Sequence, residues 1–244
     1  MRRKSWQRQL LIMGLLTLIF TIFWISGVSR LRLTWGIFAF ITGGLVALVS
    51  VYLALERRRN RMRVSEDFTD WLSFLGKSFM VIAIIITFFL FPSSVHGISM
   101  RDTLSTDDRL LVYHFNYRIE RNDIIIVRVP SRYEGERFLV KRVLILPGDR
   151  VEFASFDDST DYRILVNGQE LTSPDGTYYV LEGWQRSRIR ADSLDEQGYV
   201  QEDNYFAFGD NPEHSTDSRY YGAFSKEDII GKVIWQYWPP GGRP

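Results

Sequence analysis

The distribution of apolar and polar positions divides the 244-residue chain into two unlike parts. Two apolar runs, residues 10–29 and 33–55, contain no charged side chain, and a third, residues 71–91, contains only Lys77. As helices rising about 1.5 Å per residue, such runs cross the roughly 30 Å hydrocarbon core of a bilayer. A hairpin of buried core helices is the alternative, but the length and aromatic content of the runs favour membrane spans. We therefore expect a three-helix membrane anchor within residues 1–92.

Basic residues predict how these helices are oriented. Four lie in "MRRKSWQR" at the N-terminus, and five arginines lie in "ERRRNRMR" between the second and third runs, whereas only Arg30 and Arg32 separate the first two. Lys and Arg accumulate in cytoplasmic loops of membrane proteins. The pattern therefore predicts a multi-pass protein with a cytoplasmic N-terminus. Residues 93–244 would then lie on the outer side of the membrane.

Residues 93–244 have the pattern of a mostly antiparallel β domain. Short β-rich runs such as "RLLVYHF", "DIIIVRVP" and "RFLVKRVLIL" alternate with the turn signals "LPGD", "VNGQ" and "SPDGTY". Runs of this kind, bounded by Gly, Pro and Asn clusters, are typical of strands joined by hairpins. The segment from about 152 to 204 is more highly charged, and we expect it to be a loop-rich insertion or cap.

Composition excludes several kinds of chemistry. The formal net charge of +1 gives no support for a nucleic-acid partner. The chain contains no cysteine, so neither thiol catalysis nor a Cys-zinc site is available. Its three histidines are scattered without metal-ligand spacing. We therefore expect no metal site of these kinds.

Three stretches carry residues that could supply such a reaction. The first is "VHGISMRDTL", with Ser99 in a Gly-containing turn. The second is "RFLVKRVLIL", where strand alternation places Lys141 on the same face as Leu139 and Val143; burial there would lower the lysine pKa, and a neutral lysine can activate a serine. A solvated lysine on an edge strand is the alternative. The third is "GDNPEHSTDSRYYG", residues 209–222, which taken alone is an ordinary polar turn.

Taken in order, the patterns "GISM-x-x-TL", "VKRV-x-x-LPGD" and "GDN-x-x-x-S-x-DSR-x-x-G" resemble those of the type I signal peptidases. The resemblance covers about residues 95–235, and Gly97 gives it the Gram-positive-like form. It implies a signal-peptidase-like catalytic domain with a long coiled antiparallel sheet, and a Ser–Lys dyad of nucleophile Ser99 and general base Lys141. It implies that Ser215 hydrogen-bonds to the lysine and orients it. The other implied supporting residues are Asp217 and Arg219 as an ion pair, Arg142, Asp210 and Gly209.

The resemblance also implies a function. It is that of a membrane-bound serine endopeptidase of the bacterial plasma membrane, which removes signal peptides from secreted preproteins after small-x-small sites such as Ala-x-Ala. The resemblance implies no metal and no cofactor, and the partners would be preproteins and the lipid bilayer. Candidate residues for the substrate pockets are Val95, Met100, Leu104 and Val140. Near the C-terminus, Trp235, Tyr237 and Trp238 are candidates either for contact with the membrane interface or for core packing.

Four residues depart from the family pattern. Asp102 replaces the usual proline, Asn122 and Ile145 replace glycines, and Pro212 replaces an arginine. We expect Asp102 to loosen its turn and, as a nearby anion, to raise the lysine pKa. These departures keep alternatives open: a processing peptidase with few substrates, a degenerate relative that binds signal peptides without cutting them, or a membrane-anchored structural β domain. A self-cleaving repressor also uses Ser–Lys chemistry, but three membrane spans do not fit it.

Overall fold

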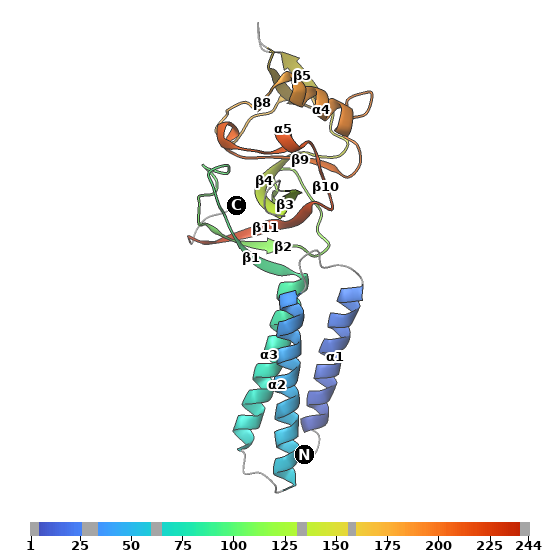
Figure 1. Ribbon diagram of the computed structural model, residues 1–244, viewed down its shortest axis with the longest axis vertical. Coiled ribbons are helices and arrows are strands. Elements are labelled where there is room, and N and C mark those ends of the chain that lie inside the picture. Colours follow the sequence, from blue (N-terminus) through green and yellow to red (C-terminus); the bar gives the residue numbers. More distant parts are fainter. Residues whose placement is uncertain (1–4, 26–33, 60–64, 131–135, 156–159, 240–244) are drawn as a thin grey trace. The chain divides into compact units, whose positions relative to one another are not determined.

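The computed structural model describes residues 5–25, 34–59, 65–130, 136–155 and 160–239 (Figure 1). The chain divides into two compact units. The first comprises Met1–Phe91 with His114–Asn116, and the second comprises Pro92–Tyr113 with Tyr117–Pro244.

The first unit is built from α1 (Ser5–Ile25), α2 (Thr34–Arg58) and α3 (Glu66–Phe88). All three are long and apolar enough to cross a membrane, which makes them candidate membrane-spanning helices. The first helix begins earlier than the predicted span of residues 10–29, whose last four residues lie outside the described residues. The second extends to Arg58, past the predicted end at residue 55.

The third helix differs most from its predicted range of residues 71–91. It begins at Glu66 because the Ser65 side chain accepts from Phe68 N and caps the first turn, where Glu66 and Asp67 complement the helix dipole. It ends at Phe88, because the chain enters strand β1 at Leu90. The apolar pattern did not predict this start, because the first turn is charged. At the other end, residues 89–91 are not helical.

Small residues let α2 and α3 approach closely. A Cβ atom added to Gly76 would lie within 3.0 Å of the Ala47 backbone, and one added to Gly43 would meet the backbone of Gly76. Small residues allow such backbone contact between helices in a membrane. Aromatic rings fill the space beside α1, where Phe20 stacks on Phe40 with centroids 4.2 Å apart.

The second unit contains a seven-stranded sheet with the order β1-β2-β11-β3-β4-β9-β10. The pairings described for β2, β11, β3, β4, β9 and β10 are all antiparallel. Register shifts interrupt β11 and β4, and such bulges bend and twist a sheet. The fold class predicted from the sequence, apolar helices followed by an antiparallel β domain, is confirmed. The strands are β1 (Leu90–Ser94), β2 (Arg109–Tyr113), β3 (Ile124–Pro130), β4 (Glu136–Ile145), β9 (Asn204–Phe208), β10 (Phe224–Ser225) and β11 (Ile229–Trp238).

A smaller sheet occupies the segment predicted to be a loop-rich insertion, so that description was wrong. Its strands are β5 (Val151–Ser155), β6 (Tyr162–Val166), β7 (Gln169–Glu170) and β8 (Val180–Leu181), followed by helix α4 (Gly183–Ser193). The sequence concealed α4 because its buried residues are Gln185, Ile189 and Ser193, of which only one is apolar. The apolar core of this region includes Tyr179, Leu181, Ile189 and Val200.

Candidate active site

Ser99 lies in the turn that follows β1, and its backbone is held by a distant loop. Asn211 N donates to Ser99 O over 3.0 Å, and Asn211 Nδ2 donates to Ile98 O over 3.1 Å. Gly97, two residues before the serine, has a φ of 94°, a left-handed conformation that glycine adopts without strain. The turn therefore presents a half-buried Ser99 side chain from a backbone tied to residues 112 positions away in sequence.

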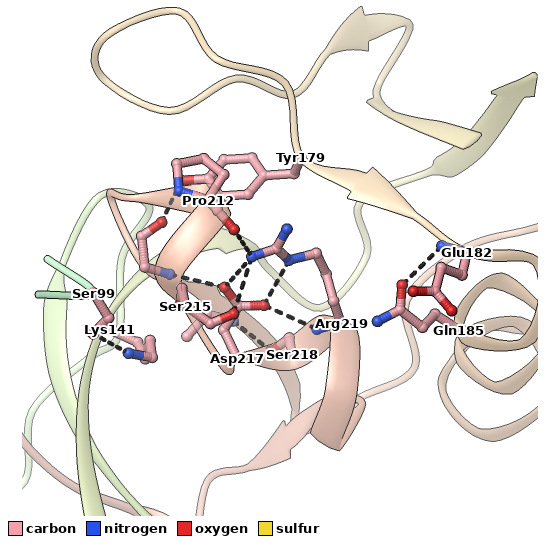
Figure 2. A network of polar contacts seen from close by, with 12 residues as sticks. Ser99, Lys141, Tyr179, Glu182, Gln185, Pro212, Ser215, Asp217, Ser218 and Arg219 are labelled. Carbon is pink, nitrogen blue, oxygen red and sulfur yellow. Dashed lines mark hydrogen bonds and ion pairs between the residues drawn. The ribbon is translucent and has the colours of Figure 1, made fainter. Parts of the chain in front are cut away.

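Lys141 reaches this serine from β4, an interior strand that pairs with β3 and β9. Its Nζ lies 2.7 Å from Ser99 Oγ and donates to it, and its side chain is only 2% exposed (Figure 2). Burial lowers the pKa of Lys141 from its ordinary value of 10.5 to about 8, although Asp217 and Asp210 each raise it. Desolvation outweighs both carboxylates, so a substantial fraction of the amine is neutral near pH 8.

The loop after β9 holds a buried ion pair. Asp217 Oδ1 accepts from Arg219 Nε over 2.9 Å, and Asp217 Oδ2 accepts from Arg219 Nη2 over 3.0 Å. The guanidinium also donates to Pro212 O and Ser215 O, and Asp217 Oδ2 accepts from Gly209 N. Because both charged groups are buried, each depends on the other and on these backbone partners. The pair thus fixes the path of residues 209–219 (Figure 2).

A second bidentate pair joins the neighbouring strand to the same loop. Arg142 Nε and Nη2 donate to the two carboxylate oxygens of Asp210 over 2.9 and 2.8 Å. Its Nη1 donates to Asn122 O, and its Nη2 also donates to Thr103 Oγ1. Arg142 follows Lys141 directly in β4, so this network ties the strand that carries the lysine to the turn that follows Ser99.

Ser215 is buried, but its predicted hydrogen bond to Lys141 is not formed. Its Oγ has no hydrogen-bond partner among the residues that the structure describes. The oxygen is packed against Gly209: a Cβ atom added there would lie closer than 3.0 Å to both Ser215 Oγ and Ser99 O. Glycine is therefore required at position 209 because no side chain fits there, and not because of an unusual φ. The orienting role of Ser215 stays a prediction.

The remaining predicted residues have different surroundings. Val95, Met100 and Leu104 are almost completely buried, whereas Val140 is half-buried. Trp235 and Trp238 are exposed on β11, which argues against a core role for these two, and Tyr237 is half-buried.

Backbone conformation accounts for two of the four sequence departures. Asn122 has a φ of 69°, which glycine adopts freely and asparagine tolerates better than most residues. Asp102 has a φ of 82°, which the proline ring forbids, so this turn is not a loosened version of a proline turn. The expectation that Asp102 raises the lysine pKa is also not met, since the carboxylates that do so are Asp217 and Asp210.

The other two departures occupy buried positions. Ile145 is buried at the register shift of β4, and Pro212 begins the 3₁₀ turn η1 (Pro212–His214).

Two site residues were missed by sequence reasoning. Asn211 belongs to the "GDN" motif, which pointed to a loop but gave no sign of its bonds to Ile98 and Ser99. Tyr179 lies in the segment taken as a loop, and its hydroxyl donates to Gly209 O. Among the described residues, no cluster of His, Cys, Asp or Glu is arranged to hold a metal ion.

Comparison with known proteins places the chain in a family. The family model described as signal peptidase, peptidase S26, matches residues 68–238. Signal peptidase IB of Staphylococcus aureus (strain Mu50) is 25% identical over 186 residues, covering 72% of this chain and 92% of that protein. Probable signal peptidase I-2 of Synechocystis sp. is 30% identical over 198 residues, covering 76% and 81%.

The chain is also similar to a solved structure. The crystal structure of a signal peptidase I from Enterococcus faecalis V583 is 27% identical, with a TM-score of 0.30, and the match covers 48% of this chain and 97% of that one. The match to the family model extends over well over half of the present chain. Because this match covers residues 68–238, the protein belongs to the signal peptidase family, peptidase S26.

Proposed function

We propose that this protein is a membrane-bound serine endopeptidase that removes N-terminal signal peptides from secreted preproteins, with Ser99 as nucleophile and Lys141 as general base. The observation that carries the proposal is the 2.7 Å contact between Lys141 Nζ and Ser99 Oγ, formed by an amine whose pKa is lowered to about 8. A hydroxyl becomes a useful nucleophile when an adjacent base accepts its proton. A buried neutral lysine meets that requirement without a histidine.

The reaction would proceed by acyl transfer. Ser99 Oγ attacks the scissile carbonyl while its proton passes to Lys141 Nζ, and main-chain N–H groups around Ser99 stabilise the oxyanion. The lysine then gives this proton to the leaving amine, and the carbon–nitrogen bond breaks. In the second half, Lys141 accepts a proton from water, whose oxygen attacks the ester. Collapse releases the new carboxylate and returns the proton to Ser99.

The buried ion pairs would hold the geometry of this dyad. Asp217 with Arg219, and Arg142 with Asp210, would immobilise the loop of residues 209–219 and join it to β4, the strand that carries Lys141. Ser215 would orient the lysine amine during the reaction. The half-buried Val140 is suited to line a shallow apolar pocket, which accepts a small side chain such as alanine, whereas the almost completely buried Val95, Met100 and Leu104 would support such a pocket from behind.

The first test is cleavage of a preprotein with an Ala-x-Ala site by the purified full-length protein in detergent. We expect a single cut after that site, abolished by Ser99→Ala and by Lys141→Met. Ser105→Ala is the matched control, because its side chain is exposed six residues further along. Binding of the signal peptide without any cut by the unaltered protein would refute the peptidase proposal in favour of a non-catalytic relative. Full cleavage by Lys141→Met would refute the dyad.

The proposed orientation has a separate test, because the chain contains no cysteine and single cysteines can be introduced cleanly. Glu196→Cys lies at an exposed position of the second unit, and Arg59→Cys follows the second candidate span. A membrane-impermeant maleimide added to intact cells should label Glu196→Cys, and Arg59→Cys only after permeabilisation. The reverse labelling would place the peptidase domain in the cytoplasm and exclude signal-peptide removal on the outer side.

A further inference from the structure

Tyr179 is a buried residue from outside the three motifs that reaches the active-site loop. It precedes β8 of the smaller sheet and is 0% exposed. Its hydroxyl donates to Gly209 O over 3.0 Å, and this hydrogen bond is itself buried. In Figure 2 the Tyr179 ring lies above the loop that contains Pro212, Ser215 and Asp217. The smaller sheet thus contributes a polar contact to the backbone beside the candidate dyad.

The contact matters because of where Gly209 lies. It is the first residue after β9, where the ladder of backbone hydrogen bonds ends. Buried backbone groups need partners, and both partners of Gly209 are side chains: Asp217 accepts from its N–H over 3.2 Å, and Tyr179 donates to its carbonyl. These two side chains therefore set the orientation of the peptide groups on either side of Gly209.

Gly209 in turn contacts the candidate nucleophile. There is no room for a Cβ atom between it and the main-chain oxygen of Ser99. Two residues later, Asn211 N donates to that same oxygen. A shift of Gly209 would therefore be transmitted to the Ser99 backbone by direct packing and by this hydrogen bond.

The Tyr179 ring and hydroxyl make separable contributions. The ring packs against Phe208, with centroids 4.8 Å apart, and the Arg219 guanidinium lies 5.6 Å from its centroid. Burial raises the pKa of Tyr179, and the nearby Asp210 and Asp217 raise it further, so the hydroxyl stays a proton donor at every working pH. Replacing tyrosine with phenylalanine removes the donor and keeps the ring.

We propose that Tyr179 is a positioning residue, whose hydroxyl anchors the Gly209 carbonyl and thereby holds Ser99 in its productive position beside Lys141. The inference rests on the proposed peptidase function and adds to it a residue from the smaller sheet. Because Tyr179 is fully buried, it does not touch substrate. Its loss should therefore lower kcat and leave KM unchanged.

The test compares Tyr179→Phe with Tyr178→Phe in the full-length protein. Tyr178 is the adjacent residue and is 39% exposed, so it is a matched control for loss of a phenol hydroxyl. We expect kcat for preprotein cleavage to fall about ten- to a hundredfold in Tyr179→Phe, the size of effect produced by small misplacements of reacting groups. KM should stay within about twofold, since only transition-state stabilisation is lost. Tyr178→Phe should match the unaltered protein.

Hydrogen exchange gives a second readout that needs no cleavage. Peptides covering residues 209–219 should exchange faster in Tyr179→Phe than in Tyr178→Phe, because the loop has lost an anchor. If the unaltered protein does not cleave preprotein, the proposed function and the catalytic role of Tyr179 both fall, while faster exchange would still establish the anchor. If the protein cleaves and Tyr179→Phe has an unchanged kcat, the positioning role alone is refuted.

Rescue distinguishes a positioning role from a general loss of folding. Incorporating p-aminophenylalanine at position 179 returns an N–H donor to the place of the hydroxyl. We expect kcat to recover to within about threefold of the unaltered protein, a difference below 1 kcal/mol in transition-state stabilisation. A variant that folds as well as the unaltered protein but keeps the kcat of Tyr179→Phe would overturn the proposal. This comparison also decides the question if Tyr179→Phe itself fails to fold.

Discussion

The candidate active site and the smaller sheet handle charge in opposite ways. Around the Ser99–Lys141 contact, four charged side chains are buried: Lys141, Asp210, Asp217 and Arg219. In the smaller sheet and α4 the buried polar side chains that the structure describes are uncharged, such as Gln185 and Ser193, and ion pairs such as Arg150 with Glu152 lie at the surface, with both side chains more than 40% exposed. Charged residues are thus buried around the Ser99–Lys141 contact and exposed to solvent in the smaller sheet.

This difference has an energetic meaning. A surface ion pair gains little, because water screens it and two long side chains lose freedom. A buried pair has paid a large desolvation cost, so removing one partner leaves an uncompensated charge in the protein interior. The contrast predicts that charge-removing substitutions will have large effects at the candidate site and small effects in the smaller sheet.

The largest effect is expected for Asp217→Ala. It leaves the Arg219 guanidinium buried without its carboxylate and removes the acceptor of Gly209 N. Breaking a buried pair in this way typically costs about 3–5 kcal/mol. In a domain of this size, each 1 kcal/mol lowers Tm by about 2–4 °C. Thermal unfolding of the full-length protein in detergent should therefore show a Tm at least about 6 °C lower, and an unchanged Tm would mean that the pair is not desolvated.

The next effect has the opposite sign. Burial holds the Lys141 pKa at about 8 in the folded protein, whereas the unfolded chain has its ordinary 10.5. Below pH 8 both states are protonated and the folded state bears the full cost of a buried charge. The folded state loses its proton first, so stability rises with pH between about 8 and 10.5.

Lys141→Met removes that cost and the titration together. At about 1.4 kcal/mol per pH unit, the gap between the two pKa values corresponds to about 3 kcal/mol. We expect Lys141→Met to be more stable than the unaltered protein at pH 7, by up to this amount, and the advantage to shrink toward pH 10. Thermal unfolding across this range measures it. If the stability advantage of Lys141→Met over the unaltered protein were smaller at pH 7 than at pH 10, burial of the lysine charge would not be its cause.

A third comparison uses glycines in place of charges. Gly209→Ala would press a methyl group into Ser215 and the Ser99 backbone, whereas at Gly183, the first residue of α4, the nearest atom to such a methyl group is Thr160 O at 3.8 Å. Overpacking a tight site costs about 1–3 kcal/mol. We expect Gly209→Ala to lower Tm and to reduce cleavage sharply, with Gly183→Ala close to the unaltered protein in both. Equal behaviour of the two variants would show that the loop of residues 209–219 has more freedom than its packing suggests.

These regions also differ in how far sequence could predict them. The contact between Ser99 and Lys141 could be predicted because both residues lie in motifs, and because strand alternation already placed Lys141 on a face with Val143. The Asp217–Arg219 pair is local, two residues apart in one turn. Tyr179 could not be found in this way, because its contact with Gly209 joins positions 30 residues apart through β8 and α4, which the charged sequence did not reveal.

Backbone conformation was the other missing information. From sequence, replacing the usual proline with Asp102 was expected to loosen the turn. Its φ of 82° shows instead a backbone conformation that proline cannot adopt. The same applies to α3, whose first turn is set by the cap at Ser65 rather than by an apolar residue. Pattern predicts faces and approximate ranges of elements, whereas caps, left-handed positions and long-range bonds need coordinates.

The pH dependence of cleavage tests the buried lysine directly. If Lys141 is the general base, only its neutral form is active, and kcat/KM reports its pKa in the free protein. We expect kcat/KM to be level above about pH 8, where the amine is mostly neutral, and to fall about tenfold per pH unit well below it. Initial rates at low substrate concentration between pH 6 and pH 10 measure this. A profile that stays level down to pH 6 would require a base other than Lys141.

The smallest effect is expected for Glu152→Ala in the smaller sheet. Its carboxylate lies 3.0 Å from Arg150 Nη2, the same distance as between Asp217 Oδ2 and Arg219 Nη2, so distance alone would rank the two pairs together. Exposure decides otherwise: with side chains 51% and 43% exposed, the pair should contribute no more than about 1 kcal/mol, and less at high salt. Tm of Glu152→Ala and the unaltered protein should therefore agree within about 4 °C at low salt and converge in 1 M salt. A loss as large as that of Asp217→Ala would mean that distance, and not burial, sets the value of charge in this fold.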